Sequence, residues 1–342
     1  MIRRLVAGAA LAVLASPALA DHMGPSGAGS GGGVNVFSPD TLDEGHWGLG
    51  LRLVYTRPEQ RSDAALEALA GEHIHAHNTD YNLNASASVA YGITHELTVS
   101  AELPYVRRDD LREGAHSHEG GTVLNEVERL GTVDGIGDVN ILAKYRLTGE
   151  QGIRFAVVGG MKLPTGSTHR RSPDGERLET EHQPGTGSWD PIFGASGAVK
   201  AGAIQLTGSA LYQLSTRGAQ RTELGDRFQG GLAISHHFGP AEEEAHHHHD
   251  GEHEEHHHSH EQHDSWDAFV ELGGEWEGRQ RIAGEVEEAS GGTWIYAAPG
   301  VRFHSASGWS AGAAVAVPLW QHIRESHPDN RFRLVVSLAK GF

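Results

Sequence analysis

Apolar and polar residues alternate with a period of two along most of the chain after residue 45. In residues 80–92, for example, one face carries tyrosine, leucine, alanine and valine, and the other carries asparagine and serine. This pattern places the two kinds of side chain on opposite faces of a β-strand. It predicts about twelve strands, at residues 46–56, 80–92, 95–106, 138–147, 152–164, 189–200, 203–214, 226–238, 265–276, 293–304, 307–320 and 330–342.

Each predicted strand has about ten residues, the length that a tilted strand needs to cross the hydrocarbon layer of a membrane. Aromatic residues lie near strand ends, as at Trp47, Trp276 and Trp320, where interfacial girdles are found in membrane barrels. A soluble β-sandwich also alternates, but it rarely needs so many long strands with aromatic ends. We therefore expect an all-β fold, a transmembrane antiparallel β-barrel of about 12 strands over residues 46–342.

The two ends of the chain add to this picture. Residues 1–20 have two arginines, a short apolar run and a small-residue site at Ala18–Ala20, which predicts a signal peptide cleaved near Ala20. Residues 21–45 are rich in glycine and serine and predict a flexible lead-in. The amphipathic last strand ends on Phe342, which resembles the signal that outer-membrane assembly machinery recognises in Gram-negative barrels. We expect an outer-membrane location.

Connection lengths predict the topology. Short turns are expected at residues 92–95, 148–151, 201–203 and 305–307, and long connections at 57–79, 107–133, 164–186, 216–225, 278–291 and 321–329. Bacterial barrels have short periplasmic turns and longer outer loops. One connection breaks the alternation, because residues 239–264 form a long segment where a short periplasmic turn belongs. We therefore expect this segment to face the periplasm.

That segment is the strongest chemical signal in the sequence. The stretch 236–263 holds 12 of the 25 histidines, interleaved with glutamates, and almost nothing that could form a core. Imidazole is the commonest ligand for zinc, copper and nickel, and carboxylates can complete the shell. We expect a disordered loop that binds several divalent metal ions with little selectivity, through His246, His247, His248, His249, His253, His256, His257, His258, His260 and His263. The alternative is a solvated acidic loop whose metal affinity has no use.

A second histidine group lies on a connection predicted to face outward. His73, His75 and His77 form an H-x-H-x-H pattern, which in an extended chain puts all three side chains on one side. They are candidate metal ligands, weighed against an ordinary polar loop. His116, His118, His169, His182, His322 and His327 are scattered over the other outward connections.

Charge and the predicted inner face limit the possible partners. The formal net charge is −18 with histidine neutral, which disfavours nucleic acid and attracts cations. No motif pairs a serine with a histidine, so we expect no enzyme. The mixed charges of the inner face either pair across the interior or line a pore; they are Asn82, Asn84, Glu96, Glu102, Asp138, Lys144, Arg146, Arg154, Lys162, Gln205, Asp267, Glu271, Glu275, Arg331 and Arg333.

Several strands resemble those of the outer-membrane family named for the meta-pathway of phenol degradation. The similar stretches are YGITHELTVSAELPYV (91–106), GIGDVNILAKYRL (135–147), MKLPTGS (161–167) and GTGSWDPIFGASG (185–197). The resemblance covers residues 40–342 and implies a small outer-membrane channel, linked to uptake of aromatic or hydrocarbon molecules. It implies no catalytic residues. The histidine-rich segment departs from the family pattern.

Three functions follow from these observations. The first is a passive outer-membrane channel that requires no cofactor and handles divalent metal ions, zinc, copper or nickel, with the histidine-rich loop as their binding site. The second is a porin for small aromatic or other organic solutes, with the histidines incidental. The third is a non-conducting surface barrel that buffers metal.

Overall fold

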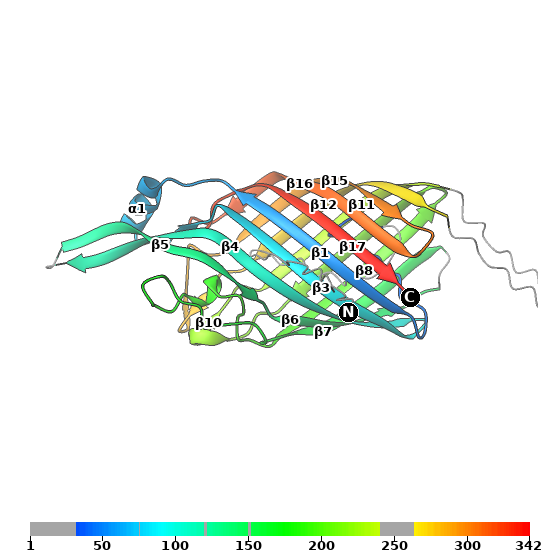
Figure 1. Ribbon diagram of the computed structural model, residues 1–342, viewed down its shortest axis with the longest axis horizontal. Coiled ribbons are helices and arrows are strands. Elements are labelled where there is room, and N and C mark those ends of the chain that lie inside the picture. Colours follow the sequence, from blue (N-terminus) through cyan, green and yellow to red (C-terminus); the bar gives the residue numbers. More distant parts are fainter. Residues whose placement is uncertain (1–31, 75, 120–121, 150–151, 240–262) are drawn as a thin grey trace, which may run out of the picture.

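The computed structural model describes residues 32–74, 76–119, 122–149, 152–239 and 263–342 (Figure 1). The predicted signal peptide, and residues 240–262 of the histidine-rich segment, lie outside these ranges. Among the described residues, no helix has the length and apolar character needed to cross a membrane.

Twelve strand positions form a closed antiparallel barrel, as the alternation predicts. The ring closes where Gly48 of the first strand pairs with Gly341 of the last. Its strands are β1 (Trp47–Pro58), β3 (Tyr81–Thr94), β4 (Leu97–Glu119), β6 (Val139–Arg146), β7 (Ile153–Leu163), β8 (Asp190–Ala201), β9 (Ile204–Gln213), β11 (Arg227–Phe238), β12 (Ser265–Glu277), β15 (Gly292–His304), β16 (Trp309–Ile323) and β17 (Asn330–Gly341).

The two faces of the barrel follow the sequence pattern. Leu49, Leu232 and Leu272 are about half exposed on the outside, while Lys144 and Glu271 are buried inside. An apolar outer surface around a polar interior is the reverse of a soluble core, and it suits a barrel surrounded by lipid. Outward tryptophans lie near both ends of the strands, including Trp47, Trp266 and Trp309 at one end and Trp276 and Trp320 at the other.

Short and long connections separate to opposite ends of the barrel. We call these the turn end, at the right of Figure 1, and the loop end, at the left. β11 and β12 meet at the turn end, where Phe238 pairs with Trp266. The flanks of the histidine-rich segment, residues 239 and 263–264, therefore lie with the short turns.

The predicted loop at 107–133 is wrong, because most of it is strand. β4 continues to Glu119 and pairs with β5 (Thr122–Ile136), forming a hairpin that extends beyond the ring. β4 pairs with β6 through Leu97–Glu102 and with β5 from Tyr105 onward. β5 and β6 therefore share one strand position of the ring beside β4. Alternation in this hairpin is hard to detect because much of it is polar on both faces.

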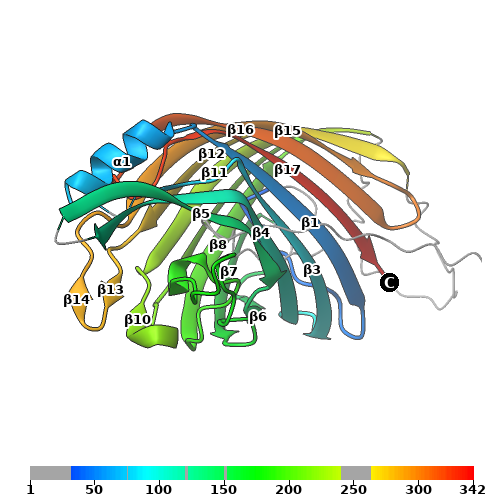
Figure 2. The same ribbon diagram turned by 60° about the vertical axis from the view of Figure 1, so that its left-hand side comes forward.

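Further elements cover the loop end. Helix α1 (Asp63–Gly71) packs on the hairpin through buried Leu66 and Ala70. The short strand β2 (His77–Asn78) pairs with β4, and β10 (Thr222–Glu223), β13 (Arg281–Ile282) and β14 (Glu285–Val286) form a separate small sheet. Single 3₁₀ turns, η1 (Thr180–His182) and η2 (Ala219–Arg221), lie in the remaining connections. Figure 2 shows α1, the hairpin and the small sheet together at this end.

Two residues expected on the inner face lie elsewhere. Arg331 is exposed because a bulge interrupts the pairing of β1 with β17, where Arg57 pairs with Phe332 but Pro58 pairs with Asn330. The extra residue in β17 moves Arg331 out of the alternation. Glu96 is exposed because it belongs to the turn between β3 and β4.

Residues 32–41 form an N-terminal segment inside the barrel. They belong to the stretch for which composition predicts a flexible lead-in, yet residues 32–39 are buried. Val34 packs with Phe269 and Tyr296, and Phe37 packs with Leu142 and Leu211. The segment leaves the lumen at the turn end, where the Leu42 amide donates a hydrogen bond to Thr98 Oγ1, and β1 then begins.

Candidate functional site

The interior of the barrel is built around the N-terminal segment and one carboxylate, Glu271. Glu271 lies near the middle of β12 and is fully buried. Its Oε2 accepts hydrogen bonds from the Asn35 amide at 2.9 Å and the Val36 amide at 3.3 Å, and its Oε1 accepts one from Asn35 Nδ2 at 2.7 Å. A carboxylate that receives several N–H donors forms the stronger, charge-assisted kind of hydrogen bond. Glu271 therefore anchors the segment.

Basic residues of the wall hold the same segment by its carbonyl groups. Arg302 Nη2 donates to the Gly33 carbonyl at 2.7 Å, Arg52 Nη2 to Asn35 Oδ1 at 2.6 Å, and Lys144 Nζ to the Ser38 carbonyl at 3.2 Å. Only glycine fits at position 33, because a Cβ there would lie 1.9 Å from Glu271 Oε2. Many wall charges thus neither line an open pore nor pair across it, but bind this segment.

Another charge group lies at the loop end of the lumen. Lys162 Nζ is 2.6 Å from Asp190 Oδ2 and 3.3 Å from Asp138 Oδ2. On the opposite wall, Arg333 Nη1 contacts both oxygens of Glu275, at 2.7 and 2.8 Å. A cavity begins at the first group and reaches out between the long connections, where His77, Glu181 and His327 line it.

A cluster of histidines and glutamates from several connections lies at the outer part of this cavity, and His77 and Glu181 of the cluster line it. His77 lies in β2, Glu181 and His182 in η1, and Glu113 in β4 opposite His77. His77 Nδ1 is 3.8 Å from Glu181 Oε1, and His182 Nε2 is 3.7 Å from the same oxygen. His182 Nε2 is also 3.5 Å from Glu113 Oε2. The His77 ring packs edge-on against His182 and His327, with centroids 4.8 and 4.4 Å apart.

Burial and neighbouring charges change the pKa values of this cluster in different directions. Desolvation, with the charges of His327, His182 and Arg108, holds the pKa of His77 well below 6.5. Desolvation also raises the pKa of Glu181 to about 7. For His182, burial alone would lower the pKa, but Glu113 and Glu181 outweigh it and raise the pKa. His77 is therefore a neutral imidazole, and it lies close to the carboxylate groups of Glu181 and Glu113.

Neighbouring connections fix the cluster in place. Gln280 Nε2 donates to Glu181 Oε2 at 2.7 Å, which leaves Oε1 facing the two histidines. Arg61 donates to the carbonyls of Glu325 and His327 at 2.6 and 2.7 Å and so holds the last long connection over the cluster. These contacts join connections that are far apart in the sequence.

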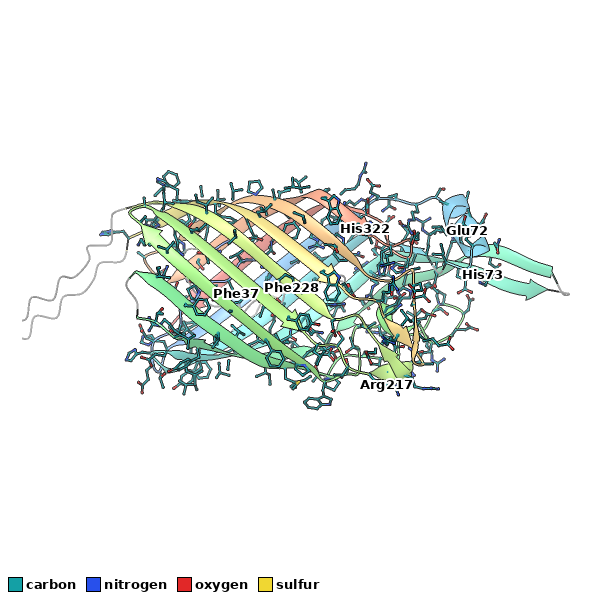
Figure 3. All side chains as sticks on the ribbon, turned by 180° about the vertical axis from the view of Figure 1, so that it is seen from behind. Phe37, Glu72, His73, Arg217, Phe228 and His322 are labelled. Atoms are coloured by element: carbon teal, nitrogen blue, oxygen red, sulfur yellow. The ribbon has the colours of Figure 1, made fainter. Side chains whose placement is uncertain are left out.

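The structure separates the predicted H-x-H-x-H triplet. α1 ends just before it, and His73 adopts a left-handed backbone with a φ of 62°, so the chain is not extended there and the predicted common face does not form. His73 is exposed beside His116 of the projecting β4–β5 hairpin, with ring centroids 5.1 Å apart (Figure 3). His75 lies outside the described residues, and His77 is buried in the cluster. His322 is exposed near the rim of the barrel.

Most ligands predicted in the histidine-rich segment, His246 to His260, lie outside the described residues. His263 is exposed at the turn end. Close to this segment's flanks, Asp267 bridges two histidines, His237 Nδ1 and His304 Nε2, each at 2.8 Å. Sequence reasoning placed His182 and His327 on outward connections but did not group them with His77 or recognise Glu181. Their only shared signal is the predicted location at one end of the barrel.

No family model matches the chain, and no curated protein matches its sequence. The resemblance to the meta-pathway family therefore stays a prediction. Among solved structures, an outer-membrane channel from Pseudomonas putida F1 is similar, with 15% identity over 89% of this chain and 97% of that chain and a TM-score of 0.56. The fold is that of an outer-membrane β-barrel.

Two further solved structures are more distant. The toluene transporter TodX of Pseudomonas putida has 10% identity over 88% of this chain and 90% of that chain, with a TM-score of 0.41. LpxR from Salmonella typhimurium has 9% identity over 86% of this chain and 99% of that chain, with a TM-score of 0.40. Scores this low carry no argument about function, so a transport role has to be argued from the residues of this chain.

Proposed function

We propose that the protein is a passive outer-membrane channel for small hydrophilic solutes, divalent metal ions above all, and not an enzyme. The observation that carries the proposal is the closed ring with an apolar outer belt and a charged interior. The outer belt suits insertion into lipid, while a polar interior is typical of barrels that pass water-soluble molecules. A polar cavity at the loop end, lined by His77 and Glu181 on its outer side and by Asp138 and Asp190 on its lumen side, supports a path for such molecules.

The residues along the cavity include many charged and polar groups, which suit hydrated solutes. Glu181 and His77 lie at its outer part, and Asp138 and Asp190, with Lys162 between them, lie at its lumen end. The carboxylates and the neutral imidazole of His77 are groups that attract a hydrated divalent cation, beside the basic side chains of Arg108, Lys162 and Arg227 in the same lining. The formal net charge of −18 acts in the same direction.

The N-terminal segment then sets the width of the path. It crosses the part of the lumen beside Glu271 and Arg302. Solutes therefore either pass beside the segment or permeate only when it is displaced. Its contacts with the wall combine hydrogen bonds and an ion pair with the apolar packing of Val34 and Phe37, so its release exposes both charged groups that water can solvate and some apolar surface. The proposed channel is therefore narrow at rest.

The histidine-rich segment completes the proposal at the other end. Its flanks lie with the short turns, which face the periplasm in barrels of known topology. Ions that leave the lumen would meet its imidazoles and carboxylates, which would raise the local concentration of zinc, copper or nickel there. The segment would act as a receiving site for ions at this end of the barrel.

Conductance tests the channel itself. Purified full-length protein in planar bilayers should give discrete current steps. The reversal potential in a potassium chloride gradient should show a higher permeability for potassium than for chloride. Zinc entry into vesicles that contain a fluorescent chelator should exceed entry into protein-free vesicles. A full-length variant with asparagine at every histidine of 246–263 should still conduct but retain less zinc. If neither the protein nor a variant with a loosened N-terminal segment conducts, the barrel is a non-conducting one.

A further inference from the structure

The buried cluster at the loop end has the geometry of a discrete metal site. Within the described part of the chain, His77, Glu181 and His182 are the only group of three or more possible ligands whose donor atoms all lie within 4.8 Å of one another. Zinc bonds of about 2.0–2.1 Å at tetrahedral angles place ligand atoms roughly 3.4 Å apart. The distances from His182 Nε2 and His77 Nδ1 to the shared Glu181 oxygen, 3.7 and 3.8 Å, need to shorten by a few tenths of an ångström, and the two imidazole nitrogens, which lie within 4.8 Å of each other, must also approach.

The geometry points to a site for one divalent transition-metal ion of the zinc class, bound by His77 Nδ1, His182 Nε2 and Glu181 Oε1. Glu113 is placed to approach the fourth position, since its Oε2 is 3.5 Å from His182 Nε2. Two imidazoles and a carboxylate are a donor set that zinc uses in proteins, whereas magnesium and calcium prefer oxygen ligands.

Two buried nitrogen atoms support the site independently of the spacing. His77 Nδ1 and His182 Nε2 are both buried, and neither makes a hydrogen bond of ordinary geometry with the described residues, although His182 Nε2 lies within ion-pair distance of Glu113 and Glu181. A buried polar atom without a partner costs free energy, and coordination of a metal ion removes that cost for an imidazole nitrogen. Both atoms lie within 4 Å of the same glutamate oxygen, where one ion would satisfy them together.

The groups around the ligands are those that a metal site requires. Gln280 holds the second oxygen of Glu181, so the first stays turned toward the histidines. Outer contacts of this kind orient the ligands and raise metal affinity. His327 packs on His77, and its Nδ1 lies 2.7 Å from Ser326 Oγ, whose hydroxyl donates to the Ala289 carbonyl. His327 Nδ1 is therefore the donor in that pair, which leaves its Nε2 with a free lone pair.

A bound ion would join connections that the barrel itself does not join. His77 belongs to the first long connection, and Glu181 and His182 belong to the one between β7 and β8. Two of the three ligands, His77 and Glu181, line the cavity at the loop end, so occupancy would both select the ion and narrow the cavity there. This role rests on the proposed channel, but metal binding at the cluster does not.

Cobalt binding to full-length protein tests the site. To remove the background of the histidine-rich segment, asparagine replaces His246–His249, His253, His256–His258, His260 and His263 in an otherwise intact chain. This protein should bind one Co²⁺ per chain with the absorption bands of a tetrahedral ion, and Zn²⁺ should displace it. Adding His182→Gln or Glu181→Gln should remove the bound equivalent and its bands. Gln280→Leu should weaken the affinity roughly 10- to 100-fold.

His169→Gln is the matched control, because His169 is an exposed histidine on the same connection as His182. It should leave the stoichiometry and the bands unchanged. The electrophoretic shift of the folded barrel on heating shows that each variant has folded. The site is overturned if the background protein binds no equivalent, or if His182→Gln binds cobalt with the same spectrum. Cobalt binding without conductance would refute the proposed channel and support the metal site. Conductance without cobalt binding would refute the metal site and support the channel.

Discussion

Replacing Glu271 by glutamine should release the N-terminal segment from the lumen. Glu271 accepts three hydrogen bonds from Asn35 and Val36. Glutamine has nearly the same shape, but it carries no charge and turns one acceptor into a donor. Whichever way the amide lies, an N–H group then faces another N–H group of Asn35.

The size of the effect follows from these contacts. Hydrogen bonds to a charged group contribute roughly 1.5–3 kcal/mol each, so losing the charge for three of them and one acceptor outright costs about 3–4 kcal/mol after partial relaxation. At 1.4 kcal/mol for each factor of ten, the ratio of released to seated segment rises about 100- to 1000-fold. The contacts of Arg52 and Arg302 with the segment remain, and they limit the change.

An introduced cysteine can report this release directly, because the chain contains no cysteine. Ser38→Cys places a thiol of similar size at a buried position of the segment. With Glu271→Gln, its maleimide labelling rate should rise by the factor above, and single-channel conductance should rise with it. Glu44→Gln is the control, since Glu44 is exposed just outside the lumen.

Gly33→Val tests the same contact from the other side. Its Cβ would lie 1.9 Å from Glu271 Oε2, so the segment and the carboxylate cannot both keep their positions. This variant should match Glu271→Gln in labelling and conductance. Unchanged labelling and conductance in both variants would refute the reasoning, and faster labelling at constant conductance would show that the segment does not narrow the path.

Other expectations concern the lipid-facing wall, the loop end of the lumen, and the contact of helix α1 with the β4–β5 hairpin. Leu232→Arg, on the outer face of β11, should cost about 2–4 kcal/mol of stability in urea unfolding from vesicles, because it moves a charge into lipid; no loss would mean that this face is not in lipid. Lys162→Gln should shift the reversal potential in a salt gradient toward the cation value, because Asp138 and Asp190 lose their cation; a shift toward the anion value would contradict the pairing. Gly114→Val should speed proteolysis within α1, because its Cβ would lie 2.4 Å from a backbone oxygen of the helix; equal cleavage rates would show that the helix tolerates the clash.

The barrel could be predicted from the sequence because its signal is local. Each strand separates lipid from lumen by itself, so a period of two appears in every strand without knowledge of its neighbours. The predicted ranges therefore fall within a few residues of the observed strands, apart from the extension of β4. The exception at Arg331 is a bulge, a change of pairing that depends on the partner strand.

The position of the N-terminal segment could not be predicted because its composition is compatible with two structures, a flexible linker and a segment packed inside the barrel. Glycine-rich stretches are usually flexible linkers, but a segment threaded past wall side chains also needs residues without a Cβ. Gly33 is glycine because Glu271 occupies the space beside it. Only the position of Glu271, more than two hundred residues later, distinguishes a linker from a threaded segment.

The histidine cluster shows the same limit. His77 was a candidate metal ligand because of the neighbouring histidines in the sequence. Helix α1 and the left-handed backbone of His73, however, place His73 beside the β4–β5 hairpin and away from His77. The partners of His77 come from residues about a hundred and more positions away. Topology predicted that these connections share one end of the barrel, and side-chain packing decided which residues meet there.

The two metal-affine regions lie at opposite ends, and this decides how their roles can be separated. The cluster of His77, Glu181 and His182 is buried and small, so it should saturate with one ion, while the histidine-rich segment has many potential donors in its sequence and should bind ions gradually. Zinc added at the loop end alone should therefore alter conductance in a single step that His182→Gln removes. Zinc added at the turn end alone should act over a wide range of concentration and be insensitive to that substitution. An organic-solute porin with incidental histidines would show neither response, because its permeation would not pass through metal ligands at either mouth.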